Sequence, residues 1–313
     1  MLIIRDSSTE VLDASVLTIG AFDGVHLGHQ QVIAQVKERA RARGVASAVV
    51  TFDTHPALVV RPESAPKLIT TLERKFELLE SFGVDVVYVI EFNTERASTT
   101  AADFVREVFV ERLNVAEIVV GSDFHFGKAR EGTVEVLTAL GKEHDFVVDG
   151  LELLRQSDTP DHISSTAIRA AMADGRVRDA NAMLGREYEI HGTIIGGDKR
   201  GRTIGFPTAN MVLTEDMAWP ANGVYAARYE TPDGIVRPAA VNIGIRPTFY
   251  TTAEQALLEA HILDFDGDLY GSDARVRVVR RLRAERRFDG IEELRIQLER
   301  DVAEVRTVLA DPC

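Results

Sequence analysis

The sequence predicts an α/β domain with a parallel sheet over residues 1–185, followed by an all-β domain over residues 186–313. Apolar, strand-like runs alternate with helical patterns as far as residue 151, and this alternation is typical of a parallel sheet covered by helices on both faces. The helical pattern stops near residues 185–188, and short alternating strands with turn residues then continue to about residue 279. We therefore place a domain boundary between residues 185 and 186.

The elements follow from the period of the apolar residues. Apolar runs predict strands at residues 16–19, 46–51, 85–90, 117–120 and 146–151. Apolar residues three or four positions apart predict helices at residues 30–43, 72–81, 101–113 and 134–143. A further helix is expected to open within residues 163–169. An amphipathic helix closes the chain, and we interpret its apolar face as core packing; that face consists of Ile291, Leu294, Leu298, Val302, Val305 and Leu309.

The first predicted strand leads into a glycine-punctuated loop that ends at a helix start, in the segment TIGAFDGVHLGHQQVI of residues 18–33. Backbone N–H groups at a helix start are unpaired and stabilise an anion, and glycines allow the chain to approach it closely. His26 and His29 add imidazoles, which can donate hydrogen bonds to a polyphosphate whose charge moves toward a leaving pyrophosphate. The motif therefore predicts nucleotidyl transfer, with these two histidines as catalytic residues. The candidate ligand-binding residues of the loop are Gly20, Phe22, Asp23 and Gly28.

Three other interpretations of this motif are open. A metal-binding histidine pair is disfavoured because flanking ligands are absent and helical metal pairs usually stand four residues apart. A dinucleotide fold requires G-x-G-x-x-G, whereas Gly20, Gly24 and Gly28 are evenly spaced. The third interpretation is a turn that merely carries surface histidines.

Two further loops follow predicted strands of the same sheet, FDTHP at residues 52–56 and GSDFHFG at residues 121–127. Because parallel strands end at one edge, we expect these loops and the loop that carries His26 and His29, residues 20–29, to form a single pocket. We call residues 20–29 the histidine loop. Aromatic rings beside polar groups suit a flat heteroaromatic ligand, although the phenylalanines could equally close the core. The candidate binding residues here are His55, Asp123, Phe124 and Phe126.

The segment ISSTAIR of residues 163–169 places hydroxyl groups and an arginine at a helix start. One hydroxyl is explained by capping the helix, but three hydroxyls with an arginine also fit a phosphate site. We therefore expect Ser164, Ser165 and Thr166 to bind nucleotide and Arg169 to take part in catalysis.

The all-β domain concentrates its polar motifs in GDKRGRTIGFPTAN at residues 197–210. Gly197, Gly201 and Gly205 permit a loop folded around phosphates, although the Walker A pattern is absent. Thr208 and Asn210 offer neutral oxygens on one side of a strand, which suits Mg²⁺.

Two residues later in this domain complete the candidates. Glu259 lies in an alternating strand pattern and is the candidate general base, although without the PTAN residues 207–210 it would be interpreted as an exposed strand glutamate. Arg283 belongs to an arginine-rich run at residues 275–287, which otherwise has the pattern of a solvated strand face, and it is a candidate cofactor-binding residue.

Composition limits the partners. The net charge is −13, so a basic face for nucleic acid is not expected, while small phosphorylated ligands remain compatible with local bases and helix ends. No apolar run approaches the length of a bilayer crossing, and the N-terminus lacks an export signal. The single cysteine, Cys313, points to a reducing compartment. We expect a cytoplasmic protein without membrane or nucleic-acid partners, either a monomer or a weak homo-oligomer.

Taken together, the motifs resemble the bifunctional prokaryotic riboflavin kinase/FAD synthetase family over essentially the whole chain. The first domain carries those of the adenylyltransferase module: GAFDGVHLGH, TFDTHP, LTTLERKFELLESFGVD, VGSDFHFG and ISSTAIR. The second domain carries those of the riboflavin kinase module: GRTIGFPTAN, NGVYA, VNIGIRPTF, LEAHILDFDGDLYG and FDGIEELRIQLERD. Thr54 departs from the family pattern, in which F-D-P-H-P is common, and this affects the expected flavin loop rather than the phosphate groups.

The resemblance implies a Rossmann-like nucleotidyltransferase domain and a six-stranded Greek-key barrel. It implies that ATP and Mg²⁺ phosphorylate riboflavin in the barrel, with Thr208 and Asn210 on the metal and Glu259 as base. It also implies that FMN then attacks a second ATP in the first domain, giving FAD and pyrophosphate. Two alternatives remain at this point: a nucleotidyltransferase for another phosphorylated small molecule, and a flavin-binding regulator without turnover.

Overall fold

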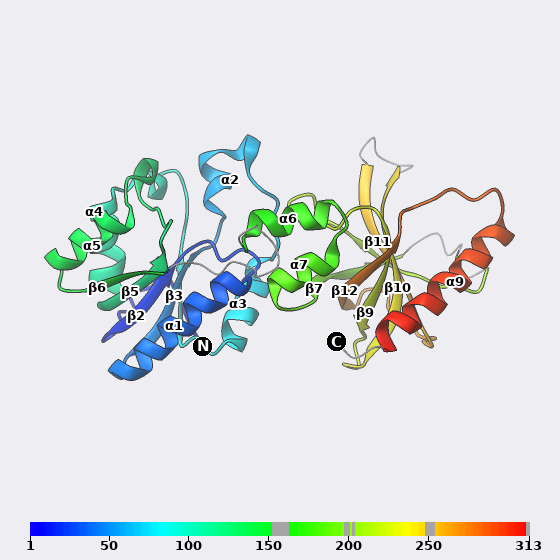
Figure 1. The fold of residues 1–313 in the computed structure, drawn as a ribbon, viewed down its shortest axis with the longest axis horizontal. Helices are drawn as coiled ribbons and strands as arrows, with labels where there is room; N and C mark the ends of the chain where they lie inside the picture. The colour runs from blue at the N-terminus through cyan, green and yellow to red at the C-terminus, as the bar shows by residue number, and fades with distance from the viewer. Residues whose placement is uncertain (152–162, 197–200, 202–203, 248–253, 311–313) are drawn as a thin grey trace. The chain divides into compact units, whose positions relative to one another are not determined.

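A computed structural model describes residues 1–151, 163–196, 201, 204–247 and 254–310. The chain forms two compact units, Met1–Ser165 and Thr166–Cys313. The first is an α/β unit and the second is a β-barrel with helices, which confirms the predicted fold classes (Figure 1).

The first unit is built on a six-stranded parallel sheet with the order β1-β4-β3-β2-β5-β6. Its strands are β1 (Leu2–Arg5), β2 (Ser15–Ile19), β3 (Ala46–Phe52), β4 (Val86–Ile90), β5 (Val115–Gly121) and β6 (Val147–Leu151). The strand order reverses between β2 and β5, and in such sheets ligands bind beyond the carboxyl ends of the strands at this point. The histidine loop follows β2 and the GSDFHFG loop follows β5, so both motifs lie at the reversal.

Helices cover both faces of this sheet. Apolar side chains of α1 and α3 pack on one face, whereas those of α4, η3 and α5 pack on the other. The bounds are α1 (Leu27–Arg43), α2 (Pro56–Val60), α3 (Leu72–Ser81), α4 (Ala101–Phe104), η3 (Val105–Arg112) and α5 (Val134–Glu143). The predictions for α3 and α5 are confirmed to the residue. Strand β1 and helix α2 were not predicted.

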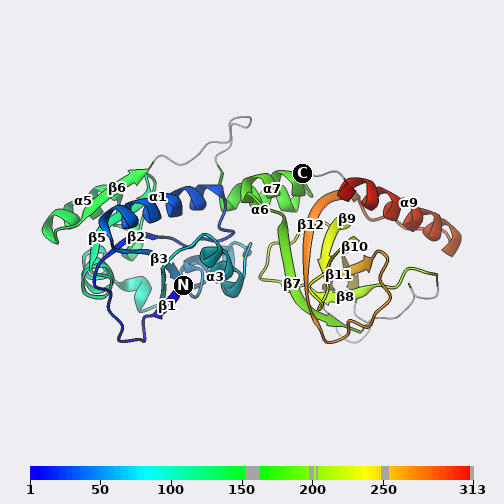
Figure 2. The same cartoon turned by 90° about the horizontal axis from the view of Figure 1, so that it is seen from below.

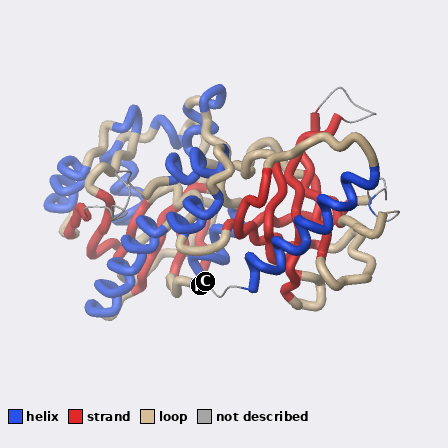
Figure 3. The backbone as a smooth tube through the Cα atoms, turned by 45° about the vertical axis from the view of Figure 1, so that its right-hand side comes forward, coloured by secondary structure: helices blue, strands red, loops and turns tan. Residues whose placement is uncertain are grey.

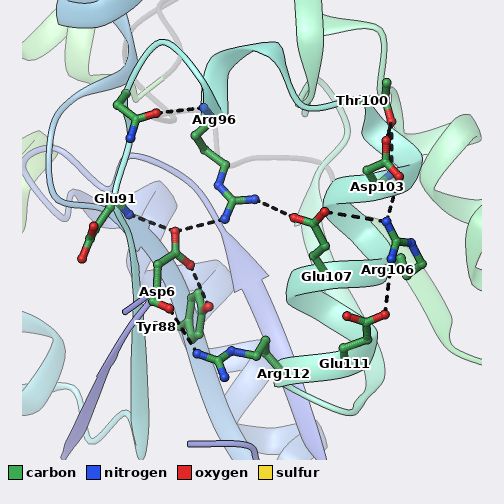
Figure 4. A network of polar contacts seen from close by, with 11 residues as sticks. Asp6, Tyr88, Glu91, Arg96, Thr100, Asp103, Arg106, Glu107, Glu111 and Arg112 are labelled. Atoms are coloured by element: carbon green, nitrogen blue, oxygen red, sulfur yellow. Dashed lines mark hydrogen bonds and ion pairs between the residues drawn. The ribbon is translucent and has the colours of Figure 1, made fainter. Parts of the chain in front are cut away.

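The helix predicted at residues 101–113 is instead a short α-helix that continues as the π-helix η3. Apolar spacing does not distinguish these two windings. A polar network holds the π-helix beside the end of β1 (Figure 4). The Asp6 carboxylate accepts hydrogen bonds from the Tyr88 hydroxyl at 2.7 Å and from Arg96 at 3.3 Å, and Arg96 also pairs with Glu107 of η3 at 3.0 Å. Burial and the Asp6 carboxylate together raise the pKa of Tyr88 to about 12.

The second unit is a closed six-stranded barrel with the order β10-β11-β8-β7-β12-β9. Its strands are β7 (Tyr188–Ile195), β8 (Ala209–Val212), β9 (Gly223–Glu230), β10 (Val236–Pro247), β11 (Glu254–Ile262) and β12 (Asp273–Arg283). Strands β9, β10 and β11 are consecutive neighbours and β12 returns beside β9, which is a Greek-key connection. The expected Greek-key barrel is therefore confirmed.

Three helices belong to the second unit: α6 (Ser165–Ala173), which begins at the last residue of the first unit, α7 (Val177–Leu184) and α9 (Ile291–Ala310). Figure 2 and Figure 3 show α9 along the outside of the barrel, where it contacts β9, β10 and β12. Helix α7 packs against β7 and β12. The compact division at residue 165 thus precedes the predicted boundary at residue 185, because α7 packs with the barrel and α6 is grouped with it. Among the described residues, no helix combines the length and apolar composition that a bilayer crossing requires.

Candidate functional site

The loop between β2 and α1 is held in an unusual backbone conformation. Phe22 has φ 49° and Val25 has φ 38°, both in the left-handed region that side chains disfavour, most strongly when they are β-branched. Such residues cost roughly 1–3 kcal/mol each and persist where the surrounding structure fixes them. Both side chains are buried, at 3% and 0% exposure. A Cβ at Gly20 would lie 3.3 Å from the Phe22 ring, so the glycine makes room for that ring.

His26 and His29 stack at the first turn of α1, with ring centroids 3.6 Å apart and an angle of 18° between the planes. His26 is the N-cap residue, and its Nδ1 accepts a hydrogen bond from the His29 backbone N–H at 3.4 Å. A neutral ring that accepts at Nδ1 carries its hydrogen on Nε2, the tautomer that can donate to a phosphate. A Cβ at Gly28 would lie 3.3 Å from the His26 ring, so a glycine here allows this capping geometry.

Helix α1 begins at Leu27, three residues before the predicted start at Gln30. The prediction missed this start because histidine is not among the usual capping residues.

Asp23 anchors the same loop from inside. Its carboxylate, 4% exposed, accepts backbone hydrogen bonds from Ile69 at 2.9 Å and from Thr70 at 3.1 Å. The Ser165 hydroxyl donates to the Asp23 carbonyl at 2.8 Å, which joins the first residue of α6 to the loop. The predicted site residues Asp23 and Ser165 are therefore adjacent, although the carboxylate itself is used for backbone anchoring.

Ser164 is half-buried and directly precedes α6, whereas Thr166 is exposed and Arg169 is half-buried on that helix. Thr166 and Arg169 fall in the second unit.

The candidate residues of the other two loops at this sheet edge differ in burial and in their contacts. His55 caps α2 by accepting from the Ala57 N–H at 3.2 Å. Phe126 is 8% exposed and belongs to the hydrophobic core, whereas Phe124 is half-buried and stacks on it with centroids 5.4 Å apart. Asp123 is exposed. Of the two predicted aromatic rings, Phe124 is thus the more exposed.

In the barrel, a row of residues runs across five adjacent strands. Asn210 of β8 lies opposite Glu259 of β11, and Glu259 lies opposite Asn242 of β10. Asn242 in turn faces Val224 of β9, which faces Arg283 of β12. Directly opposed residues share one face of a sheet, and all five line one cavity of about 560 Å³ beneath α9.

A second cavity, of about 310 Å³, adjoins the first at the PTAN segment, residues 207–210. Gly201, Thr208 and Asn210 line both cavities, whereas Glu259 lines only the larger one. The segment is fixed by His261, whose Nδ1 is 2.9 Å from the Pro207 carbonyl oxygen. Two side chains with neutral oxygen atoms, Thr208 and Asn210, therefore lie where the two cavities meet.

The glycines before this segment shape a turn. A Cβ at Gly201 would lie only 2.2 Å from the Phe206 carbonyl oxygen, and Gly205 has φ 87°, so other residues at these positions would be strained. The Phe206 N–H donates to the Gly201 carbonyl at 2.8 Å and closes the turn. The predicted phosphate-loop residue Gly197 lies outside the described residues.

Arg283 is committed to a buried ion pair. Its guanidinium makes three hydrogen bonds to the carboxylate of Asp301 on α9, at 2.9, 3.2 and 2.7 Å, and Asp301 is 2% exposed. The interpretation of α9 as core packing alone is corrected here, because Leu294, Leu298 and Val302 line the larger cavity. The sequence analysis did not identify Asp301 as a site residue. Its position three residues after Leu298 places a carboxylate on the apolar face of this helix, and this pattern could have indicated a buried, paired charge.

We expect Asp301→Asn to lower the free energy of unfolding of the second unit by about 3 kcal/mol, because Arg283 would lose its charged partner. Urea unfolding followed by fluorescence of the single tryptophan, Trp219, measures this unit specifically. Glu304→Gln is the matched control, since Glu304 pairs with Arg280 at 3.5 Å between the same helix and strand but both side chains are largely exposed. Its effect should stay below about 1 kcal/mol. Equal effects of both substitutions would contradict a special role for Asp301.

Comparison with known families matches each unit separately. Residues 8–167 match the family model for FAD synthetase, and residues 184–309 match that for riboflavin kinase. The bifunctional riboflavin kinase/FMN adenylyltransferase of Bacillus subtilis strain 168 is 42% identical over 294 residues, covering 93% of this chain and 91% of the relative. The protein of the same name from Escherichia coli K12 is 37% identical over 298 residues, covering 95% and 94%.

Among solved structures, a Streptococcus pneumoniae protein described as a macrolide-efflux protein superposes with a TM-score of 0.86 at 31% identity. The match covers 98% of this chain and 99% of that protein. The likeness therefore extends over both units.

Proposed function

The chain belongs to the bifunctional riboflavin kinase/FMN adenylyltransferase family, and from this premise we propose where on the chain each of its two reactions takes place. The enzyme converts riboflavin to FMN and FMN to FAD, with ATP as the second substrate of each step.

For the kinase step, riboflavin occupies the larger barrel cavity and ATP the smaller one. The larger cavity combines apolar walls from α9 with the rings of Phe206 and Phe288, which suits a flat tricyclic ring. Of the two cavities, the Glu259 carboxylate lines only the larger one. There it can accept the proton of a ribityl hydroxyl. The observation that carries this assignment is that Thr208 and Asn210 line both cavities.

The reaction follows from this arrangement. The hydroxyl oxygen of riboflavin forms a bond to the γ-phosphorus of ATP, its proton passes to Glu259, and the bond to the bridging oxygen breaks to release ADP. The Thr208 hydroxyl and the Asn210 amide oxygen form the neutral, hard donor set that fits Mg²⁺. When bound, Mg²⁺ would offset negative charge on the transferring phosphate.

For the adenylyl-transfer step, FMN and ATP meet at the sheet edge beyond β2 and β5. An FMN phosphate oxygen forms a bond to the α-phosphorus of ATP, and the bond to the bridging oxygen breaks to release pyrophosphate. The phosphate is already anionic at neutral pH, so the protein contributes positioning and charge stabilisation through His26 and His29. Asp123 and Phe124 border the flavin in this proposal. The assignment of Thr166 and Arg169 as phosphate ligands stays a prediction.

Replacement of Asn210 tests the placement of the metal. We expect Asn210→Ala to reduce FMN formation by roughly 100-fold and to raise the Mg²⁺ concentration needed for half-maximal rate, because one oxygen ligand is lost. Riboflavin binding, measured by flavin fluorescence, should change little. Asn242→Ala is the control, since Asn242 lines only the larger cavity. An unchanged Mg²⁺ requirement in Asn210→Ala, or the same increase in Asn242→Ala, would rule out this metal site.

A further inference from the structure

A buried lysine lies between the two loops that follow β2 and β3 in the first unit. Lys75 of α3 is only 8% exposed. It lines a small cavity of about 30 Å³, which holds little more than a water molecule. The same cavity is lined by Asp23 of the histidine loop and by Asp53 and His55 of the FDTHP loop. The reactions described above give this ammonium group no role.

Lys75 is hydrogen-bonded to the end of β3 and is linked through Thr51 to the loop after β2. Its Nζ donates to the Thr51 hydroxyl at 3.2 Å and to the Phe52 carbonyl at 3.3 Å, at the end of β3. The Thr51 hydroxyl in turn donates to the Ala21 carbonyl at 3.3 Å, in the loop after β2. A continuous chain of hydrogen bonds thus runs from α3 through the end of β3 to the histidine loop.

The charges around Lys75 are unbalanced. Two carboxylates face it, those of Asp23 and Asp53, and the neighbouring imidazole of His55 is a third titratable group. Asp53 is itself fixed by accepting from the Phe92 N–H at 2.9 Å. Without the ammonium charge, two carboxylates would face the edge at which anionic substrates bind, and like charges in a poorly solvated site repel strongly.

We propose that Lys75 is a positioning residue for adenylyl transfer, which offsets these carboxylates and fixes the two loops so that FMN and ATP can approach each other. This inference rests on the proposed placement of adenylyl transfer at this sheet edge. The lysine touches protein groups only and acts through the loops that it joins.

The inference predicts a pH dependence with a definite sign. Burial lowers the pKa of Lys75 to about 8, a shift that Asp23 and Asp53 oppose. The phosphates of FMN and ATP lose their last protons near pH 6, so the substrates are already fully ionised at about pH 8. FAD formation should therefore decline above about pH 8 as Lys75 loses its proton.

Unfolding of the protein cannot explain a decline of FAD formation above pH 8. The folded pKa of about 8 lies below the ordinary value of 10.5. The unfolded chain therefore binds more protons between these two values, and Lys75 contributes stability that rises with pH in this window. As the pH rises above 8, deprotonation of Lys75 should therefore lower the rate of FAD formation while raising the free energy of unfolding.

The test measures kcat/KM for FMN in FAD formation by the full chain, from about pH 6.5 to 9.5. The wild-type value should fall by up to about tenfold per pH unit above pH 8, as expected for one proton. Lys75→Met should be at least tenfold lower at pH 7, mainly through KM, with no decline near pH 8. Lys75→Arg keeps the charge and should retain activity without that decline. Lys142→Met, at an exposed lysine in the last turn of α5, should behave as the wild type.

Riboflavin kinase activity, measured in the same samples, should be equal in all variants. Wild-type kcat/KM and an unchanged pH profile in Lys75→Met would overturn the inference. If circular dichroism shows that both Lys75 variants fail to fold, the wild-type profile decides, and a constant kcat/KM across pH 7.5–9.5 overturns it. A fully active His29→Ala variant would instead contradict the placement of the adenylyl-transfer site.

Discussion

Glu259→Gln is expected to reduce the kcat of FMN formation by about 10²- to 10⁴-fold, because the amide cannot accept the proton of the riboflavin hydroxyl. FAD formation from added FMN should be unchanged, since the proposed adenylyl-transfer residues His26 and His29 lie in the other unit. Separation of the flavin products after incubation with ATP and Mg²⁺ measures both reactions in one sample.

Glu285→Gln provides the control for Glu259. Glu285 lines the same cavity, where Asn242 donates to its carboxylate at 3.3 Å, but it is not in the strand row opposite Asn210. Its replacement should alter KM for riboflavin more than kcat. Full kinase turnover in Glu259→Gln, or an equal loss of kcat in both variants, would refute the assignment of Glu259 as the base.

His29→Ala is expected to reduce FAD formation by about 10²- to 10³-fold while leaving FMN production intact, so that FMN accumulates from riboflavin. The loss corresponds to removing one preorganised hydrogen-bond donor from a developing phosphate charge. The stacked partner of His26 disappears as well, which loosens the cap of α1. Product analysis with riboflavin as the only supplied flavin shows the accumulation directly.

His144→Ala is the matched control for His29, because His144 is a histidine of the same unit at the C-cap of α5. It should leave both reactions unchanged. Equal loss of FMN and FAD formation in His29→Ala would show that the two sites are not separate.

The arrangement of the sheet edge was predictable from the sequence. Alternating strands and helices require parallel strands, and parallel strands place the loops after β2, β3 and β5 at one edge. Strand β1 escaped prediction because it is only four residues long and its apolar run is limited to Leu2, Ile3 and Ile4. The predicted boundary differs for a related reason: α7 was not predicted as a helix, and the sequence did not reveal that its apolar side chains pack on β7 and β12.

The polar residues that line the barrel cavities were singled out from the sequence, whereas the apolar walls of these cavities were not. Glu259, Thr208 and Asn210 stood out because they are polar groups in strand-like segments. Helix α9 as a cavity wall did not, because apolar spacing is the same whether the facing space is filled or open. Lys75 lies on the predicted helix at residues 72–81, where only the fold shows that the side chain is enclosed between two loops.

The two sheets differ in how they end. The barrel closes on itself, so each of its strands is paired on both sides, whereas the parallel sheet formed by the described residues terminates at β1 and β6. Both terminal strands carry exposed apolar side chains: Leu2 at 46%, Ile3 at 39% and Val147 at 52%. Unpaired backbone beside apolar side chains is the usual template for aggregation. In concentrated or partly denatured preparations, intermolecular strand addition would therefore start from the FAD-forming half of the enzyme rather than from the FMN-forming half.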